Sequence, residues 1–172
     1  MAYNKEQFEN LIKKTLQKME RYISKPLSPQ SAINLLLGTC AVESQFGTYL
    51  RQLNDGPALG PFQMEPDTER DTWQTFITYR KDLKTCLQAM CGATGSQPER
   101  LETDLVYAIV MARVKYLRVK LPLPPEDNIP ALGAYWKVYW NSHKGAGKIE
   151  DFIRCYQEFV RGDVSGKQRP QA

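Results

Sequence analysis

The chain has 172 residues, of which 42% are hydrophobic, and this is enough for one domain with a buried core. The formal net charge is +4, and the lysines and arginines are spread among acids, so nucleic-acid binding is not expected. The one concentration of basic residues, 113–120, fits a solvated helix face. No apolar run reaches the length of a membrane span, so no membrane insertion is expected.

The first predicted helix follows Asn4, which forms a capping box with Gln7. Apolar residues then recur at helical spacing up to Tyr22, which indicates a helix packed by one face onto a core. Lys25-Pro26 ends this segment.

The second predicted helix begins at Ser28, with the serine as N-cap and Pro29 in the first helical position. Ala32, Leu36 and Cys40 are four residues apart, and this spacing places Glu43 at the end of the same apolar stripe. Gly47 is the expected stop of the helix.

Glu43 has two interpretations. Partial burial and the negative end of the helix dipole both favour its protonated form, and a raised pKa suits a general acid near neutral pH. The ordinary alternative is an acid in a frayed last turn that points into water.

The remaining chain predicts further helices joined by polar loops. After a loop over residues 49–60, one helix begins at Pro66 and reaches Met90, and a second runs from about Glu99 to Leu121. A proline-rich connector precedes an aromatic-rich helix from Ala131 to about Asn141. A glycine loop over residues 143–148 leads to an amphipathic helix over residues 149–160.

These elements predict an all-α protein, with six to eight helices around one core and room for a minor β element in the loop before Pro66. The expected domain covers residues 1–161. Residues 162–172 are expected to be a polar, disordered tail.

The four cysteines match no zinc pattern, and with His143 as the single histidine no metal site or cofactor is expected. Cys40, Cys86 and Cys155 lie on apolar helical faces, which is typical of buried thiols. Cys86 and Cys91 are close enough in sequence to pair in an oxidising compartment, and this question stays open.

Glu43-Ser44 is followed one loop later by Gly60-Pro61-Phe62-Gln63-Met64. This order resembles the glutamate–serine and glycine-x-x-glutamine signature of lytic transglycosylases, which belong to the lysozyme superfamily and have an α-helical fold. Residues 108–125 are similar to the later helix of small phage-type members, and residues 135–153 to the tyrosine- and asparagine-containing segment before their final helix. The resemblance covers residues 30–160.

The resemblance implies an enzyme that cuts the β-1,4 bond between MurNAc and GlcNAc in peptidoglycan, without a cofactor. Glu43 would protonate the bridging oxygen and then act as base on the 6-hydroxyl of MurNAc, closing a 1,6-anhydro ring. The other implied site residues contact the glycan or support the glutamate, with Tyr139 favoured as the residue that steadies Glu43: Ser44, Gly60, Phe62, Gln63, Tyr139 and Asn141.

Two departures from the family pattern keep other functions open. Pro61 replaces the usual apolar residue and removes a backbone donor, and the family's tyrosine–asparagine string is not intact. A hydrolytic lysozyme would use water with a second carboxylate, for which Asp55, Glu65 and Asp67 are candidates. A phage structural or wall-binding protein with the same fold is the non-catalytic alternative.

The resemblance implies peptidoglycan glycan strands as the partner. The first ten residues lack a signal peptide, so synthesis in a bacterial cytoplasm is expected. The protein would then reach the wall in a phage virion, through a pore, or by a secretion apparatus.

Overall fold

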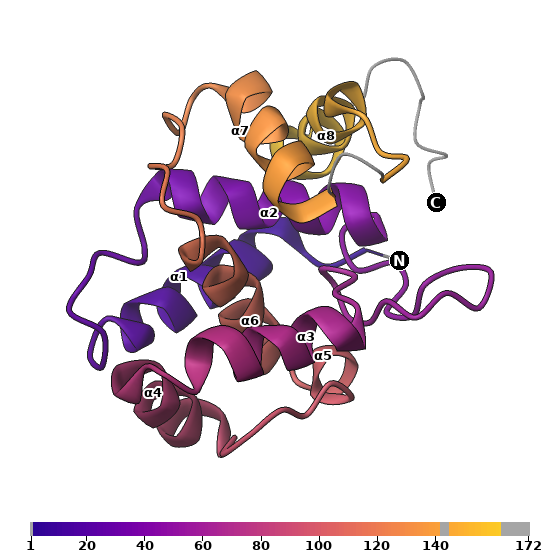
Figure 1. Ribbon diagram of the computed structural model, residues 1–172. Coiled ribbons are helices and arrows are strands. Elements are labelled where there is room, and N and C mark those ends of the chain that lie inside the picture. The colour runs from indigo at the N-terminus through magenta and orange to yellow at the C-terminus, as the bar shows by residue number, and fades with distance from the viewer. Residues whose placement is uncertain (1, 142–144, 163–172) are drawn as a thin grey trace.

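The computed structural model describes residues 2–141 and 145–162, and this part of the chain is built from helices and loops (Figure 1). It contains eight α-helices and three short π-helical segments, which confirms the predicted all-α class. In chain order the elements are α1 (Lys5–Met19), α2 (Gln30–Ser44), α3 (Pro66–Thr72), η1 (Trp73–Ile77), α4 (Lys81–Cys91), α5 (Arg100–Thr103), α6 (Leu105–Leu117), α7 (Ile129–Trp136), η2 (Lys137–Asn141), α8 (Ile149–Cys155) and η3 (Tyr156–Arg161).

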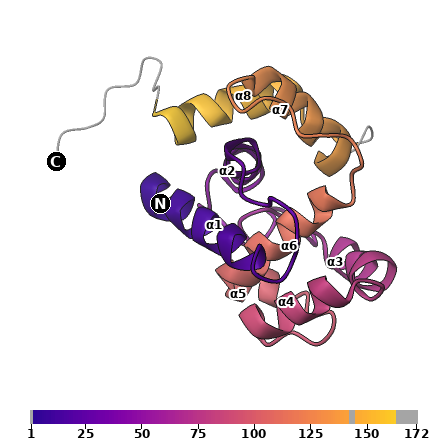
Figure 2. The ribbon, with the colours of Figure 1, turned by 90° about the vertical axis from the view of Figure 1, so that its left-hand side faces the viewer.

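Helix α2 is the centre of the fold, because apolar side chains surround most of its circumference. In Figure 2 it is seen nearly end-on, with α1 and α6 on one side and the pair α7–α8 on the other. A helix that is apolar on all sides must be covered by neighbours on all sides. Gly38 allows one close approach, since a Cβ there would meet the ring of Phe152 from α8 at 2.1 Å.

The start of α2 differs from the prediction. The N-cap is Pro29, and Ser28 does not cap the helix. Instead the backbone N–H and the hydroxyl of Ser28 both donate to the Glu20 carboxylate, each at 2.8 Å. The Glu20 carboxylate competes successfully for the serine because charged acceptors form the stronger hydrogen bonds. At the start of α1, by contrast, the Asn4 side chain accepts from Gln7 N–H as predicted, at 3.0 Å.

The two long predicted helices are each broken. Arg80 is extended and separates η1 from α4, and Asp104 is extended and separates α5 from α6. The Asp104 side chain accepts from the backbone N–H of Tyr107, so it caps a new helix instead of continuing the old one. The apolar residues keep their helical spacing across both breaks, so the sequence pattern does not show where the helices end.

The loop between α2 and α3 holds a minor β element of isolated bridges only. Leu59 pairs with Arg51 and with Met64, and the described residues contain no strand. Gly60 is required here, because its φ is +74° and a Cβ would lie 1.9 Å from the carbonyl oxygen of Leu101. This contact fixes the loop against the start of α5–α6.

The described residues share one buried apolar core, to which every α-helix except α3 contributes hydrophobic residues. Within this part of the chain, no helix is long and apolar enough to cross a bilayer. The prediction of a disordered tail from residue 162 concerns residues that lie almost entirely outside the described ranges.

Candidate active site

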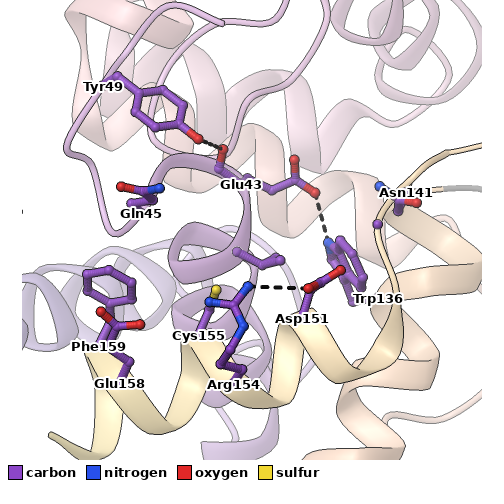
Figure 3. Close-up of a pocket in the computed structure, with 12 residues that line it drawn as sticks. Glu43, Gln45, Tyr49, Trp136, Asn141, Asp151, Arg154, Cys155, Glu158 and Phe159 are labelled. Atoms are coloured by element: carbon purple, nitrogen blue, oxygen red, sulfur yellow. Dashed lines mark hydrogen bonds and ion pairs between the residues drawn. The ribbon is translucent and has the colours of Figure 1, made fainter. Parts of the chain in front are cut away.

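Glu43 lies in the last turn of α2, where the chain leaves the helix through three successive left-handed residues, Gln45, Phe46 and Gly47. Gly47 was the predicted stop, and the helix ends slightly before it. The hydroxyl of Tyr49 donates to the backbone carbonyl of Glu43 at 3.1 Å and so occupies one of the free carbonyls at the helix end. The Glu43 side chain is half-buried and extends toward α7 (Figure 3).

Two hollows meet at Glu43. The first, of about 500 Å³, is lined mainly by α2, α8 and η3, with Trp136 from α7, and the second, of about 660 Å³, by the loop before α3 together with α6 and the segment after α7. They share Glu43, Tyr49, Asn141 and Gly147. Each hollow has the size of a small-molecule site. A polymeric ligand that extends from one hollow into the other would contact Glu43.

The environment of Glu43 raises its pKa to about 7, with burial of the carboxyl group as the main cause. Two contacts oppose this effect. The indole N–H of Trp136 donates to Oε1 at 2.9 Å, and the Lys115 ammonium favours the charged form from nearby. At neutral pH the carboxyl group is therefore present in both protonation states, as a group that first donates and then accepts a proton requires.

Among the described residues that line the second hollow, Lys115 is the cation. It projects from α6, its ammonium lies 4.0 Å from the ring centre of Trp140, and its Nζ donates to the Trp140 carbonyl at 3.3 Å. Burial lowers its pKa to about 8, against the raising effects of Glu43 and Glu65. The prediction of a solvated basic face over residues 113–120 is wrong here, because Lys115 is half-buried and Arg113 is buried.

Three of the predicted glycan contacts lie beneath the hollows and line neither of them. Ser44 is fully buried, and its hydroxyl lies 2.7 Å from the Pro61 carbonyl and accepts from Gly47 N–H at 2.8 Å. Gly60 contacts Leu101, and Phe62 packs in the core between the rings of Phe8 and Trp140. These residues hold the loop onto the end of α2 and so position Glu43 and the wall of the second hollow.

Gln63 does reach the second hollow. Its backbone is left-handed with φ of +46°, and its side-chain Nε2 donates to the Gly60 carbonyl at 2.8 Å. Its Oε1 is buried and accepts no hydrogen bond from any described residue. An unpaired buried acceptor is costly to stability, and Gln63 retains one in the wall of this hollow.

Two predicted contacts come from the segment after α7. Asn141 lines both hollows, and its Oδ1 accepts from Lys137 Nζ at 2.7 Å. Tyr139, which was expected to steady Glu43, packs instead against Tyr135 with ring centres 4.6 Å apart and lines a different hollow beside Lys120. The hydrogen bond to Glu43 comes from Trp136.

Trp136 is not among the predicted site residues, although the spacing of the buried aromatic residues contains a signal for it. Leu132, Trp136 and Trp140 are four residues apart and are all buried, whereas Tyr139 belongs to the neighbouring face of the helix. The buried face of this segment is therefore the one that carries the donor to Glu43.

Of the proposed second carboxylates, only Glu65 lines a hollow with Glu43. Asp55 belongs to an exposed turn with φ of +55°, and exposed Asp67 pairs with Arg70 at 2.7 Å. In the first hollow, Asp151 accepts from Lys148 N–H and from Arg154, as Figure 3 shows for the arginine. These contacts hold Asp151 in a capping role at the start of α8.

The cysteines are thiols, and Cys40, Cys86 and Cys155 are buried as predicted. Burial raises the pKa of Cys40 to about 12, which removes it as a nucleophile at neutral pH. His143 lies outside the described residues. Within the described ranges, no group of three or more histidine, cysteine, aspartate or glutamate side chains could hold a metal ion.

Comparison with protein-family models, with curated proteins and with solved structures finds no match to this chain. Assignment of a function therefore depends on the geometry around Glu43 and on the resemblance of the motifs.

Proposed function

We propose that this protein is a peptidoglycan-cleaving enzyme that cuts the β-1,4 bond between MurNAc and GlcNAc by lytic transglycosylation, with Glu43 as its acid and base. The observation that carries this proposal is a half-buried carboxyl group with a pKa of about 7 where two ligand-sized hollows meet. The motif resemblance to lytic transglycosylases supports the same residue independently of this geometry.

In the proposed reaction, protonated Glu43 donates its proton to the bridging oxygen as positive charge develops at the anomeric carbon. The resulting carboxylate is stabilised by the Trp136 N–H and by the Lys115 ammonium. It then removes the proton of the MurNAc 6-hydroxyl, whose oxygen closes the anhydro ring. One carboxyl group serves both steps, and no water enters the product.

Gln63 and Asn141 are the proposed glycan contacts. Gln63 lines the wall of the second hollow and Asn141 lies at the junction of the two hollows, so both are placed to meet a sugar hydroxyl or an N-acetyl group. Ser44, Gly60 and Phe62 support this surface from below. The Pro61 departure also lies below it, because Pro61 is buried and lines neither hollow.

A hydrolytic lysozyme is the second candidate, and one observation favours it. Glu65 lines the same hollow as Glu43 and interacts electrostatically with the same Lys115 ammonium. A carboxylate there would activate a water molecule for attack on the sugar.

The proposed substrate lies in the cell wall, whereas synthesis is expected in a bacterial cytoplasm. The protein is therefore proposed to act after release through a pore or a secretion apparatus, or to be carried in a phage virion.

The decisive experiment digests purified peptidoglycan in heavy-oxygen water with wild type, Glu43→Gln and Glu65→Gln, and analyses the muropeptides by mass spectrometry. We expect anhydro products about one water lighter than hydrolysis products, without heavy oxygen, from wild type and Glu65→Gln, and no products from Glu43→Gln.

Reducing ends that carry heavy oxygen, lost in Glu65→Gln, would establish the lysozyme instead. An intact wall with wild type, combined with retained binding to insoluble peptidoglycan, would overturn the enzyme proposal in favour of the non-catalytic one.

A further inference from the structure

Arg113 is a buried charge on the side of α6 away from the Glu43 site. The residue is only 5% exposed, and its Nε donates to the carbonyl of Leu27 at 3.0 Å. This bond ties α6 to the turn that precedes α2. It uses one of the five N–H groups of the guanidinium.

The rest of the guanidinium has no acidic partner in the described part of the chain. No carboxylate oxygen there lies within 4 Å of it. Glu20 acts on it electrostatically from beyond ion-pair distance, and the Oε1 of Glu20 accepts from Leu27 N–H and from both donors of Ser28. Burying a charge without a paired counter-charge is unfavourable.

Arg113 lines a hollow of about 370 Å³, here called the Arg113 hollow. The two Nη atoms donate to no described residue and are not fully enclosed, since Gln63 Oε1 is the only enclosed side-chain polar atom without a partner among the described residues. Lys25 lines the same hollow, together with Pro26, Pro29, Pro122 and the buried Tyr135. Tyr135 is held in place, since its hydroxyl donates to the Leu121 carbonyl at 3.2 Å.

We propose that the Arg113 hollow is a binding site for a small oxyanion, a phosphate or a carboxylate group, held by the Nη atoms of Arg113 and by Lys25. A guanidinium presents two parallel N–H donors that match the oxygens of such a group. A neutral donor would be sufficient for the hydrogen bond to the Leu27 carbonyl, so this bond does not explain why a charged side chain is buried here. The site is independent of the reaction proposed at Glu43.

The test uses the full chain labelled with nitrogen-15 and follows the Arg113 Nε–H signal and the Leu27 and Tyr135 amides by NMR. Inorganic phosphate and acetate are added separately, with sodium chloride at matched ionic strength as the reference. We expect saturable shifts at these three positions with at least one oxyanion and none with chloride. The tighter of the two oxyanions identifies the group that the site prefers.

Three variants test whether the oxyanion binds at Arg113 and Lys25. Arg113→Met is expected to abolish the saturable shifts, and Lys25→Gln to weaken the affinity by roughly threefold or more, the effect of losing one partly exposed charge contact. Lys13→Gln, exposed on α1, removes the same charge and is expected to change nothing. If Arg113→Met does not fold, the Lys25→Gln and Lys13→Gln pair decides. Equal affinity in that pair, or shifts that grow linearly with salt, would overturn the proposal.

Discussion

Glu43→Gln is expected to stabilise the folded protein at neutral pH, whatever reaction the site performs. Burial raises the pKa of Glu43 from 4.5, the value of an exposed glutamate, to about 7. Below pH 4.5 the group is protonated in the folded and the unfolded chain alike. As pH rises through this interval, ionisation favours the unfolded chain, so the stability that the protonated group contributes is lost.

The size of this effect follows from the pKa difference. One pKa unit corresponds to about 1.4 kcal/mol, so the pKa difference between the folded and the unfolded chain changes the free energy of unfolding by roughly 3 kcal/mol. Most of this contribution to stability is lost between pH 5 and pH 8. The glutamine variant has no such loss, and its Oε1 can still accept the Trp136 hydrogen bond.

Urea unfolding of wild type and Glu43→Gln at pH 5 and pH 8 measures the effect. The free energy of unfolding of the variant, minus that of wild type, is expected to increase by roughly 2 to 3 kcal/mol between these pH values. Glu126→Gln, exposed in the connector before α7, corrects for the removal of one negative charge. A difference that does not change with pH would refute the reasoning, because Glu43 would then ionise like a solvated acid in a frayed turn.

Three further predictions concern the surroundings of Glu43. Trp136→Phe removes the donor to Oε1 and is expected to raise the Glu43 pKa by roughly one unit, followed by carbon-13 NMR of the carboxyl group; an unchanged pKa would contradict this. Lys115→Met removes the nearby positive charge, so the Glu43 pKa and the alkaline limb of the pH–activity profile should both move to higher pH, and a limb that moves down would oppose it. Gly60→Ala is expected to cost roughly 2 to 4 kcal/mol in urea unfolding, because its Cβ would lie 1.9 Å from the Leu101 carbonyl oxygen. Gly92→Ala, also at positive φ but with nothing within 4 Å, should cost about 1 kcal/mol, and equal costs would show that the contact is unimportant.

Local signals in the sequence were sufficient for much of the fold. Asn4 begins α1 and Pro66 begins α3, since a capping side chain and a proline act on the turn that contains them. The four-residue spacing from Ala32 also placed Glu43 in the last turn of α2. Breaks in the longer helices were missed, because Arg80 and Asp104 interrupt the backbone without interrupting the apolar pattern.

The partners of Glu43 could not be predicted in the same way. The resemblance implied Tyr139, whereas the donor is Trp136, three residues earlier on the same segment. A shift of three residues turns a side chain by roughly 60° about the helix axis, and Tyr139 therefore packs against Tyr135 instead of Glu43. Lys115 was assigned to a solvated face because its run of charges is ordinary in sequence, and only packing shows that it is half-buried.

The sequence by itself determined an all-α chain, the order of its helices and a glutamate at the end of an apolar helix, because these depend on periodicity and on signals within a few residues. Tertiary structure alone decided that Ser44, Gly60 and Phe62 lie beneath the site while Trp136 and Lys115 act on the Glu43 carboxyl group. The physical reason is that the pKa of a carboxyl group depends on burial and on charges and donors supplied by helices distant in sequence. Only the folded chain brings those helices together.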